Sequence, residues 1–214
     1  PAHPLATLPG VGVAYKLAEA LFRVTRRAER RADSGADAQP YMDLVALGTV
    51  ADIVPLVDEN RLLVRQGLDL LRGAPRPGVA ALMSQAGVRQ AAASSTDISF
   101  RLAPRLNAAG RIKSARLAYD LLRTTSAEVG AELAGELGAV NQQRQALLDK
   151  QVLEARELLG HGPPPPVLFV DGPDFHEGIV GLIASRLVEE YYRPALVMRR
   201  GPQTTRGSAR SIEG

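Results

Sequence analysis

Apolar residues recur at helical spacing through most of the first 160 residues, and the pattern then changes to short strands. The segment 8–22 begins with turn residues and continues with apolar positions three and four residues apart, which predicts a helix. The run 41–56 is apolar on every side, which is typical of a buried element, and its composition favours a helix stopped by Pro55. The same spacing predicts further helices over 60–72, 79–86 and 114–123.

The run 126–160 predicts one long helix, because Ser126 can cap it and a broken apolar stripe follows. The stripe has no strict heptads, and the run 161–166 that comes next is rich in proline. This combination favours a spacer between two domains over a coiled coil. A charged and then small-residue stretch, 23–39, predicts a frayed helix end followed by a solvated loop.

The chain after residue 166 has the pattern of a small α/β domain. It predicts, in order, a strand, a helix, a strand and the start of a third strand, over 167–171, 178–192, 194–198 and 207–212. Alternation in the third strand puts Ser208 and Arg210 on one face, where both can reach a phosphate, although small polar residues of any surface strand have the same pattern. His176 lies at the predicted strand-to-helix turn, where a capping role is the alternative to a substrate contact.

Composition restricts the chemistry. The absence of cysteine excludes disulfides, thiolate catalysis and cysteine-based metal sites. The histidines at 3, 161 and 176 are scattered, so a metal would be held largely by oxygen ligands, which favours magnesium or manganese over zinc. No apolar run approaches the roughly 20 residues of a membrane span, and the first residues do not form a signal peptide. We therefore expect a cytoplasmic location without membrane contact.

The net charge is +3, and the basic residues are nearly all arginine. The planar guanidinium suits phosphate recognition, although a G+C-rich genome produces the same preference. Charge therefore permits a nucleic-acid partner without requiring one.

Two segments carry candidate chemistry. Asp52 is flanked by apolar residues, where an ionised carboxylate is retained when it is paired or bound to a metal; the alternative is a helix-end carboxylate that points to water. The segment 100–111 presents Arg101, Arg105, Arg111 and Asn107 around a proline and a glycine, which predicts a shaped loop for bidentate phosphate contacts. The alternative is that these arginines cap helices and pair with nearby acids.

Four motifs in order, over 46–56, 103–111, 176–186 and 207–211, resemble the RecJ family of bacterial single-strand-specific DNA exonucleases, within the DHH phosphoesterase superfamily. The resemblance covers nearly the whole chain. It implies an α/β fold of two lobes joined by a long helix, with single-stranded DNA in the cleft between them. The corresponding division is a mostly helical C-terminal part of the phosphoesterase domain, a connecting helix with its linker, and the start of the DHH-associated domain, over 1–125, 126–162 and 163–214.

The resemblance also implies two-metal hydrolysis of phosphodiester bonds with manganese or magnesium, in the 5′-to-3′ direction, in DNA repair and recombination. Asp52 matches the last metal-ligand aspartate of the first lobe and is the catalytic and metal-ligand candidate. Residues matching the segment that faces the scissile phosphate and the nucleotide-binding motif of the second lobe are the substrate-binding candidates: Arg105, Asn107, Arg111, His176, Gly207, Ser208, Arg210 and Ser211.

The chain departs from the family pattern because it has neither the Asp-rich motif nor the Asp-His-His motif. We therefore expect an internal piece of a longer exonuclease, inactive alone, since one carboxylate does not hold two hard cations. Alternatives are a non-catalytic DNA-binding or interaction module on the same scaffold, and a phosphoesterase for short oligonucleotides or cyclic dinucleotides. Expected partners are single-stranded DNA, single-strand-binding protein and other repair proteins, with the protein itself a monomer.

Overall fold

The computed structural model describes residues 5–28 and 37–213, so His3 and residues 29–36 of the predicted loop lie outside the described residues. The residues before them, 23–28, form the last part of a helix, where the sequence predicted a helix end. The chain divides into two compact units. Unit 1 comprises Pro1–Leu106 and Leu117–Gly138, and unit 2 comprises Asn107–Arg116 and Ala139–Gly214. The domain boundaries inferred from the sequence stay predictions.

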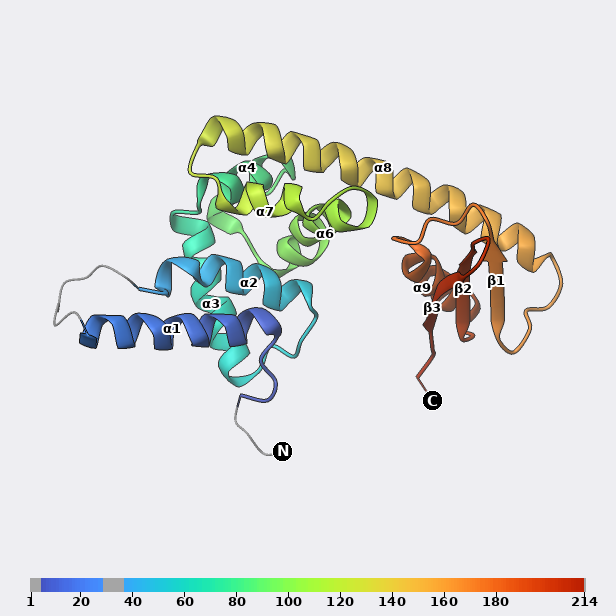
Figure 1. Cartoon of the computed structure of the whole chain (residues 1–214), viewed down its shortest axis with the longest axis horizontal. Helices are drawn as coiled ribbons and strands as arrows, with labels where there is room; N and C mark the ends of the chain where they lie inside the picture. The colour runs from blue at the N-terminus through green and yellow to red at the C-terminus, as the bar shows by residue number, and fades with distance from the viewer. Residues whose placement is uncertain (1–4, 29–36, 214) are drawn as a thin grey trace. The chain divides into compact units, whose positions relative to one another are not determined.

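Unit 1 is built from helices (Figure 1). The sequence predicted its longer helices correctly: α1 (Gly10–Ala28), α2 (Met42–Ala51), α3 (Asp58–Gly73), α4 (Pro77–Gln85) and α7 (Arg116–Arg123). Short helical turns complete it, namely η1 (Gln39–Tyr41), η2 (Gln90–Ala92) and α5 (Ser95–Asp97).

Helix α2 lies at the centre of the unit 1 core, as its all-round apolar pattern predicted. Met42 and Val45 pack with Tyr15 of α1 and Leu63 of α3 in one cluster. The helix ends at Ala51, before the predicted stop at Pro55, because Ile53 takes a left-handed conformation with φ 55° and turns the chain. Asp52 is therefore the residue that caps the carboxyl end of α2.

The loop prediction for residues 100–111 was wrong. The structure has a π-helical turn, η3 (Ile98–Leu102), which continues directly into α6 (Ala103–Ile112). Proline breaks a helix because its ring meets the carbonyl four residues earlier and it has no N–H to donate. Pro104 lies in the first turn of α6, directly after the wider π turn, where the α-helical hydrogen-bond register is already changed.

Helix α8 (Ala127–Leu159), which has 33 residues, confirms the long helix predicted over 126–160. The Val129 N–H donates to Ser126 Oγ at 3.3 Å, and Gly160, with φ 76°, ends the helix. The helix does more than connect, because Leu137 is buried in unit 1 and Val152 belongs to the core of unit 2. Within the described residues, no helix is both long and apolar enough to span a membrane.

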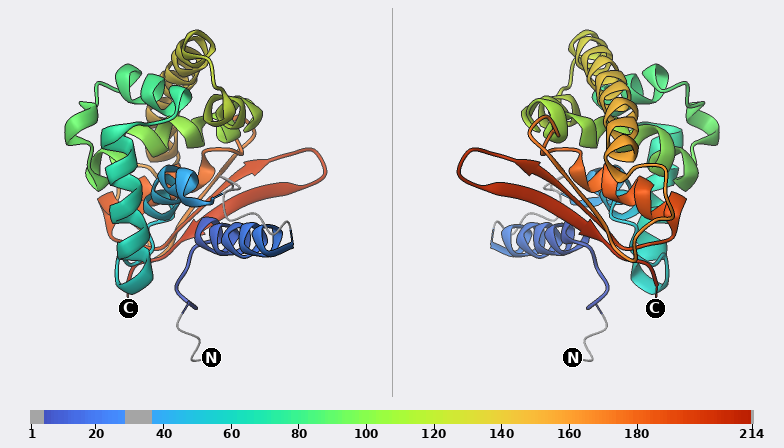
Figure 2. Two further views of the ribbon diagram at one scale, coloured as in Figure 1. Left: turned by 90° about the vertical axis from the view of Figure 1, so that its left-hand side faces the viewer. Right: turned by 90° about the vertical axis from the view of Figure 1, so that its right-hand side faces the viewer.

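Unit 2 contains a small mixed sheet, and its order of strand, helix, strand and strand is the predicted one. It is formed by β1 (Leu168–Gly172), β2 (Ala195–Arg200) and β3 (Thr205–Arg210), which lie in the sheet in the order β1-β2-β3. In the sequence, α9 (Val180–Tyr191) connects β1 to β2. The pair β1 and β2 is parallel, whereas β2 and β3 form an antiparallel hairpin, which Figure 2 shows as a twisted ribbon.

The core of unit 2 fixes which face of β3 points toward α9. Val170 and Val197 are buried with Ile183 of α9, whereas Phe169 on the opposite face of the sheet is exposed. In the β2 and β3 register, Val197 lies opposite Ser208. Because side chains alternate along a strand, Ser208 and Arg210 both lie on the face that α9 covers.

Candidate nucleic-acid interface

Ser208 and Arg210, which the sequence placed on one face of β3, contact each other. Arg210 Nη1 donates to Ser208 Oγ at 2.9 Å and to the Ala209 carbonyl at 2.7 Å. Gly181, in the first turn of α9, lies against this pair, because a Cβ there would be 3.1 Å from both Ser208 Oγ and Arg210 Nη2. A side chain at this position would crowd the hydroxyl and the guanidinium, so glycine keeps them accessible at the start of α9.

Arg111 lies at the same end of α9. Its Nη1 donates to the Gly178 carbonyl at 3.1 Å. Any Cβ on Gly178 would overlap the Arg111 carbonyl, so the two backbones are in direct contact and only glycine fits. Arg111 and the Ser208 and Arg210 pair thus contact glycines three positions apart, about one helical turn. Unit 2 therefore brings together three candidate residues from two separate motifs, Arg111 from 103–111 and Ser208 and Arg210 from 207–211.

Charge pairing separates Arg210 from the other arginines of β2 and β3. Within the described residues, Arg210 has no carboxylate partner, and its hydrogen bonds go to neutral oxygens. It therefore keeps an uncompensated positive charge with donors to spare. The other three arginines form ion pairs: Arg199 with Glu177 at 3.0 Å, Arg206 with Glu177 at 3.5 Å, and Arg200 with Asp171 at 2.6 Å.

The arginines at 101 and 105, both in unit 1, divide in the same way. Arg101 lies 3.7 Å from Asp97, so for this residue the acid-pairing alternative holds. Arg105 Nε donates to Gln85 Oε1 at 2.8 Å, and its Nη1 donates to the Arg101 carbonyl at 2.6 Å. Burial and, second, the nearby charge of Arg101 lower the pKa of Arg105, as expected for a partly desolvated cation without an acid beside it. A phosphate contact by Arg105 stays a prediction.

The other substrate candidates of unit 2 are less constrained. Asn107 and Ser211 are exposed, and Ser211 Oγ donates to the Ile212 carbonyl at 3.1 Å. Gly207 lies on β3 opposite Met198, so closely that a side chain there would collide with that residue. Its glycine is explained by strand packing, and its predicted role in substrate binding stays a prediction.

His176 caps the turn before α9, as the alternative interpretation expected. Its Nδ1 accepts a hydrogen bond from the Gly178 N–H at 3.1 Å, which leaves the proton of the neutral ring on Nε2. The backbone N–H of His176 donates to Oε1 of the buried Gln151 at 3.0 Å, and Gln151 Nε2 donates to the Asp174 carbonyl at 2.6 Å. The ring also lines an open hollow of about 490 Å³, together with Leu147, Gln151, Pro173, Asp174, Phe175, Glu177 and Arg199.

Asp52, the candidate metal ligand, is exposed at the carboxyl end of α2, as the alternative of a helix-end carboxylate expected, and it is not a buried charge. The buried carboxylate of the run 41–56 is Asp43, of which 3% is exposed. The two residues are nine positions apart, which is about 180° around a helix, so they lie on opposite sides of α2. The metal role of Asp52 stays a prediction based on the motif.

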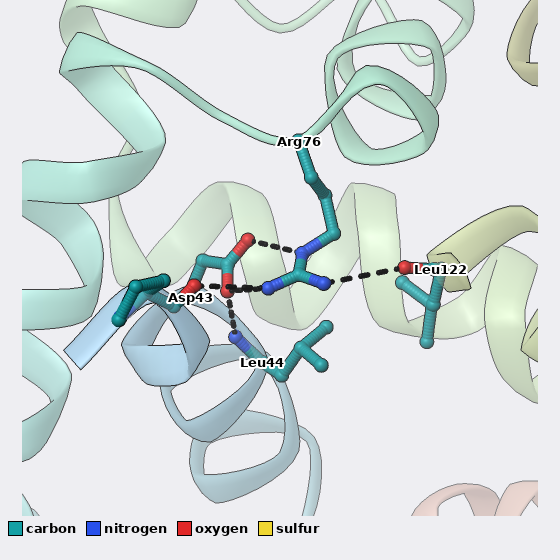
Figure 3. A network of polar contacts seen from close by, with 5 residues as sticks. Asp43, Leu44, Arg76 and Leu122 are labelled. Atoms are coloured by element: carbon teal, nitrogen blue, oxygen red, sulfur yellow. Dashed lines mark hydrogen bonds and ion pairs between the residues drawn. The ribbon is translucent and has the colours of Figure 1, made fainter. Parts of the chain in front are cut away.

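Asp43 forms a bidentate ion pair with Arg76 (Figure 3). Arg76 Nε donates to Asp43 Oδ2 at 2.7 Å and Nη2 donates to Oδ1 at 2.8 Å, while the Leu44 N–H also donates to Oδ1 at 2.8 Å. Further donors of Arg76 reach the carbonyls of Pro40 at 3.0 Å and Leu122 at 3.5 Å. This network connects α2 to the start of α4 and the end of α7, and we infer a structural role for it.

The residues fit a divalent metal only in part. The carboxylate of Asp52 is exposed, and no interaction of it is recorded among the described residues, so it can supply one hard oxygen ligand. Across 5–28 and 37–213, no group of three or more histidine, aspartate or glutamate residues could hold a metal ion. A two-metal centre needs more ligands than this, so we derive no hydrolytic step from the described residues.

Sequence reasoning missed Asn60, which holds the loop that follows Asp52. Its side-chain amide is fully buried, and Nδ2 donates to the carbonyls of Thr7 at 2.9 Å and Pro55 at 3.2 Å. A polar amide at a position that packs into the core was a usable signal, because buried amides are kept when they satisfy backbone groups.

Comparison with known proteins identifies the class of this protein. Curated proteins that match nearly the whole chain are single-stranded-DNA-specific exonucleases: one from Bacillus subtilis is 39% identical over 99% of the chain, and one from Escherichia coli is 39% identical over 99% of it. The chain spans only 26% and 38% of the length of these two relatives. No protein-family model matches it.

These relatives carry the name RecJ, and solved RecJ structures match the fold. A manganese complex from Thermus thermophilus superposes with a TM-score of 0.79 at 32% identity, covering 96% of this chain and 29% of that protein. A second manganese-bound RecJ structure has the same TM-score and identity and covers 99% of this chain and 51% of its own. The chain is therefore homologous to a segment of RecJ, which confirms the resemblance drawn from its motifs.

Proposed function

We propose that this chain is the DNA-holding part of a metal-dependent, single-strand-specific DNA exonuclease of the RecJ type. The observation that carries the proposal is the cluster at the start of α9, where Arg210, Ser208 and Arg111 lie together and neither guanidinium is paired with an acid among the residues that the structure describes. A guanidinium fork and a hydroxyl are suitable donors to phosphate oxygens. The names of the relatives and the metals in their solved structures support the substrate and the cofactor, manganese or magnesium.

Several finer expectations belong to the same proposal. Asp52 would contribute one ligand to the metal centre, which in such enzymes activates the attacking water and stabilises the charge on the phosphate. The 5′-to-3′ direction, roles in repair and recombination, protein partners such as single-strand-binding protein, and a monomeric, cytoplasmic state rest on the sequence resemblance.

Binding of a fluorescently labelled oligothymidine strand to the 214-residue chain tests the DNA-holding role. We expect binding that weakens with salt, and we expect Arg210→Gln to lower affinity about tenfold, because a charge-assisted hydrogen bond is lost. The matched control is Arg200→Gln on the neighbouring strand, whose charge Asp171 neutralises. The control should change affinity by no more than about twofold.

Incubation of the same chain with the strand and manganese tests the catalytic part. We expect binding without cleavage, since the described residues supply one metal ligand, and cleavage once the segment is placed in a full-length RecJ. Robust cleavage by the chain alone would contradict the assignment of the remaining ligands to other parts of the enzyme. Failure of the unmodified chain to bind single-stranded DNA would overturn the proposed function itself.

A further inference from the structure

A guanidinium outside the motifs, that of Arg144 on α8, is held in place with its fork free. Arg144 is partly buried, and its Nε donates to Oδ1 of Asn141 at 3.2 Å. Asn141 is only 4% exposed, so this anchor is itself buried. For the two terminal amino groups of Arg144, no hydrogen bond or ion pair is recorded within the part of the chain that the structure describes. Four N–H donors therefore remain for a ligand.

The elements that carry Arg111, Arg144 and Arg186 meet over one apolar core. Ile112, Leu148 and Ile183 pack in the same cluster, and they come from α6, α8 and α9. Arg144 is four positions before Leu148 and Arg186 is three positions after Ile183, about one helical turn in each case, whereas Arg111 directly precedes Ile112. The shared core thus brings together three segments, far apart in the sequence, that each carry one of these arginines.

Electrostatics agrees with this placement. Burial is the main cause that lowers the pKa of Arg144, and repulsion from Arg111 and then Arg186 lowers it further. Asp149 acts in the opposite direction. The other nearby carboxylate, Glu189, forms a mostly exposed pair with Arg186 at 3.5 Å, which salt and water screen. Three clustered guanidiniums thus face no buried carboxylate among the described residues, and an anion would relieve their repulsion.

We propose that Arg144, with Arg111, binds one backbone phosphate of single-stranded DNA at a subsite adjoining the Ser208 and Arg210 pair, where Arg186 adds a nearby positive charge. Arg111 links the two places, because it contacts Gly178 at the start of α9, one turn before Gly181 and the β3 pair. Two phosphate positions along one strand would then be held by unit 2. This subsite rests on the proposed function, since it assumes that the strand reaches the start of α9.

The salt dependence of oligothymidine binding to the chain tests the subsite. For single strands, the slope of log K against log salt changes by about 0.7 for each phosphate contact. We expect Arg144→Gln to make the slope shallower by about 0.7 and to weaken binding about tenfold. Arg144→Lys should keep the slope and recover only part of the affinity, because the charge remains while the fork is lost.

The control is Arg156→Gln on the same helix. Because Arg156 is paired with Glu190 at 2.7 Å, this substitution should leave the salt slope unchanged. Thermal unfolding of each variant separates binding from folding. A lower melting temperature for Arg144→Gln with an unchanged salt slope would show a purely structural residue and overturn the subsite. If the unmodified chain binds DNA and Arg210→Gln weakens it while Arg144→Gln does not, the subsite fails and the proposed function stands.

Discussion

Replacing Asp43 with alanine should destabilise unit 1 strongly, because it leaves the charge of Arg76 without its partner. The substitution removes both oxygens that accept from Arg76 Nε and Nη2, and it also removes the acceptor of the Leu44 N–H. Breaking a buried ion pair from one side costs about 3–5 kcal/mol. The Arg76 side chain is 21% exposed and keeps the Pro40 carbonyl at 3.0 Å, so water and one acceptor can compensate in part. We therefore expect the lower end of that range, about 3 kcal/mol.

The measurement is urea unfolding followed by far-ultraviolet circular dichroism, which reports the helices of unit 1. In thermal unfolding of the same variant, a loss of about 3 kcal/mol corresponds, for a chain of this size, to a fall in melting temperature of roughly 6–12 °C. The matched control is Asp69→Ala, because Asp69 pairs with Arg72 at 3.4 Å on the surface. Such pairs contribute about 0–1 kcal/mol, so the control should unfold nearly like the parent chain.

A double variant tests the cause. Asp43→Leu combined with Arg76→Met removes both charges, and apolar replacement of a buried pair is often neutral, so we expect most of the stability to return. An Asp43→Ala variant that loses no more stability than Asp69→Ala would refute the view that this network holds α2 against α4 and α7.

Four further predictions concern single substitutions. Thr49→Val should raise the free energy of unfolding by about 1 kcal/mol in urea titrations, because Thr49 Oγ1 is buried and has no hydrogen-bond partner among the described residues. Asn60→Leu should lower it by about 2 kcal/mol, since two carbonyls lose their donor, and amide exchange should rise in the loop after Asp52. Gly178→Ala should weaken oligothymidine binding measured by anisotropy, because the new methyl group displaces α9 from Arg111. In a full-length RecJ that carries this segment, Asp52→Ala should abolish manganese-dependent cleavage and leave strand binding nearly unchanged; normal turnover would refute the metal assignment.

The arrangement of unit 2 could be predicted from sequence because its signals are local. The short apolar runs of β1 and β2 and the helical spacing of α9 each fit within about a dozen residues, and the short connections then allow few topologies. Alternation also placed Ser208 and Arg210 on the same face, and their hydrogen bond at 2.9 Å confirms it. The contact of Arg111 with Gly178 could not be predicted, because it joins residues 67 positions apart.

The errors in unit 1 have two causes. One is a local exception to the rule that proline breaks a helix, and the other is a contact between residues far apart in the sequence. Pro104 was interpreted as a helix breaker, but the π turn just before it lets the helix continue. Asp43 and Asp52 lie in one apolar run, and periodicity alone does not show which of them points inward. Arg76, which lies 33 positions after Asp43 in the sequence, forms the ion pair that holds Asp43 in the interior.

Pairing, more than position in a motif, decides which arginines of this chain can bind phosphate. A guanidinium already bound to a carboxylate must give up that partner before a phosphate can replace it, so its net gain is small. A guanidinium held by a carbonyl, hydroxyl or amide oxygen keeps its charge and its spare donors, and it is oriented without being neutralised. Arg144 meets this condition although no motif includes it, whereas Arg101 lies in the candidate segment 100–111 and fails it through Asp97. The arginines that meet the condition among those discussed are Arg105, Arg111, Arg144 and Arg210.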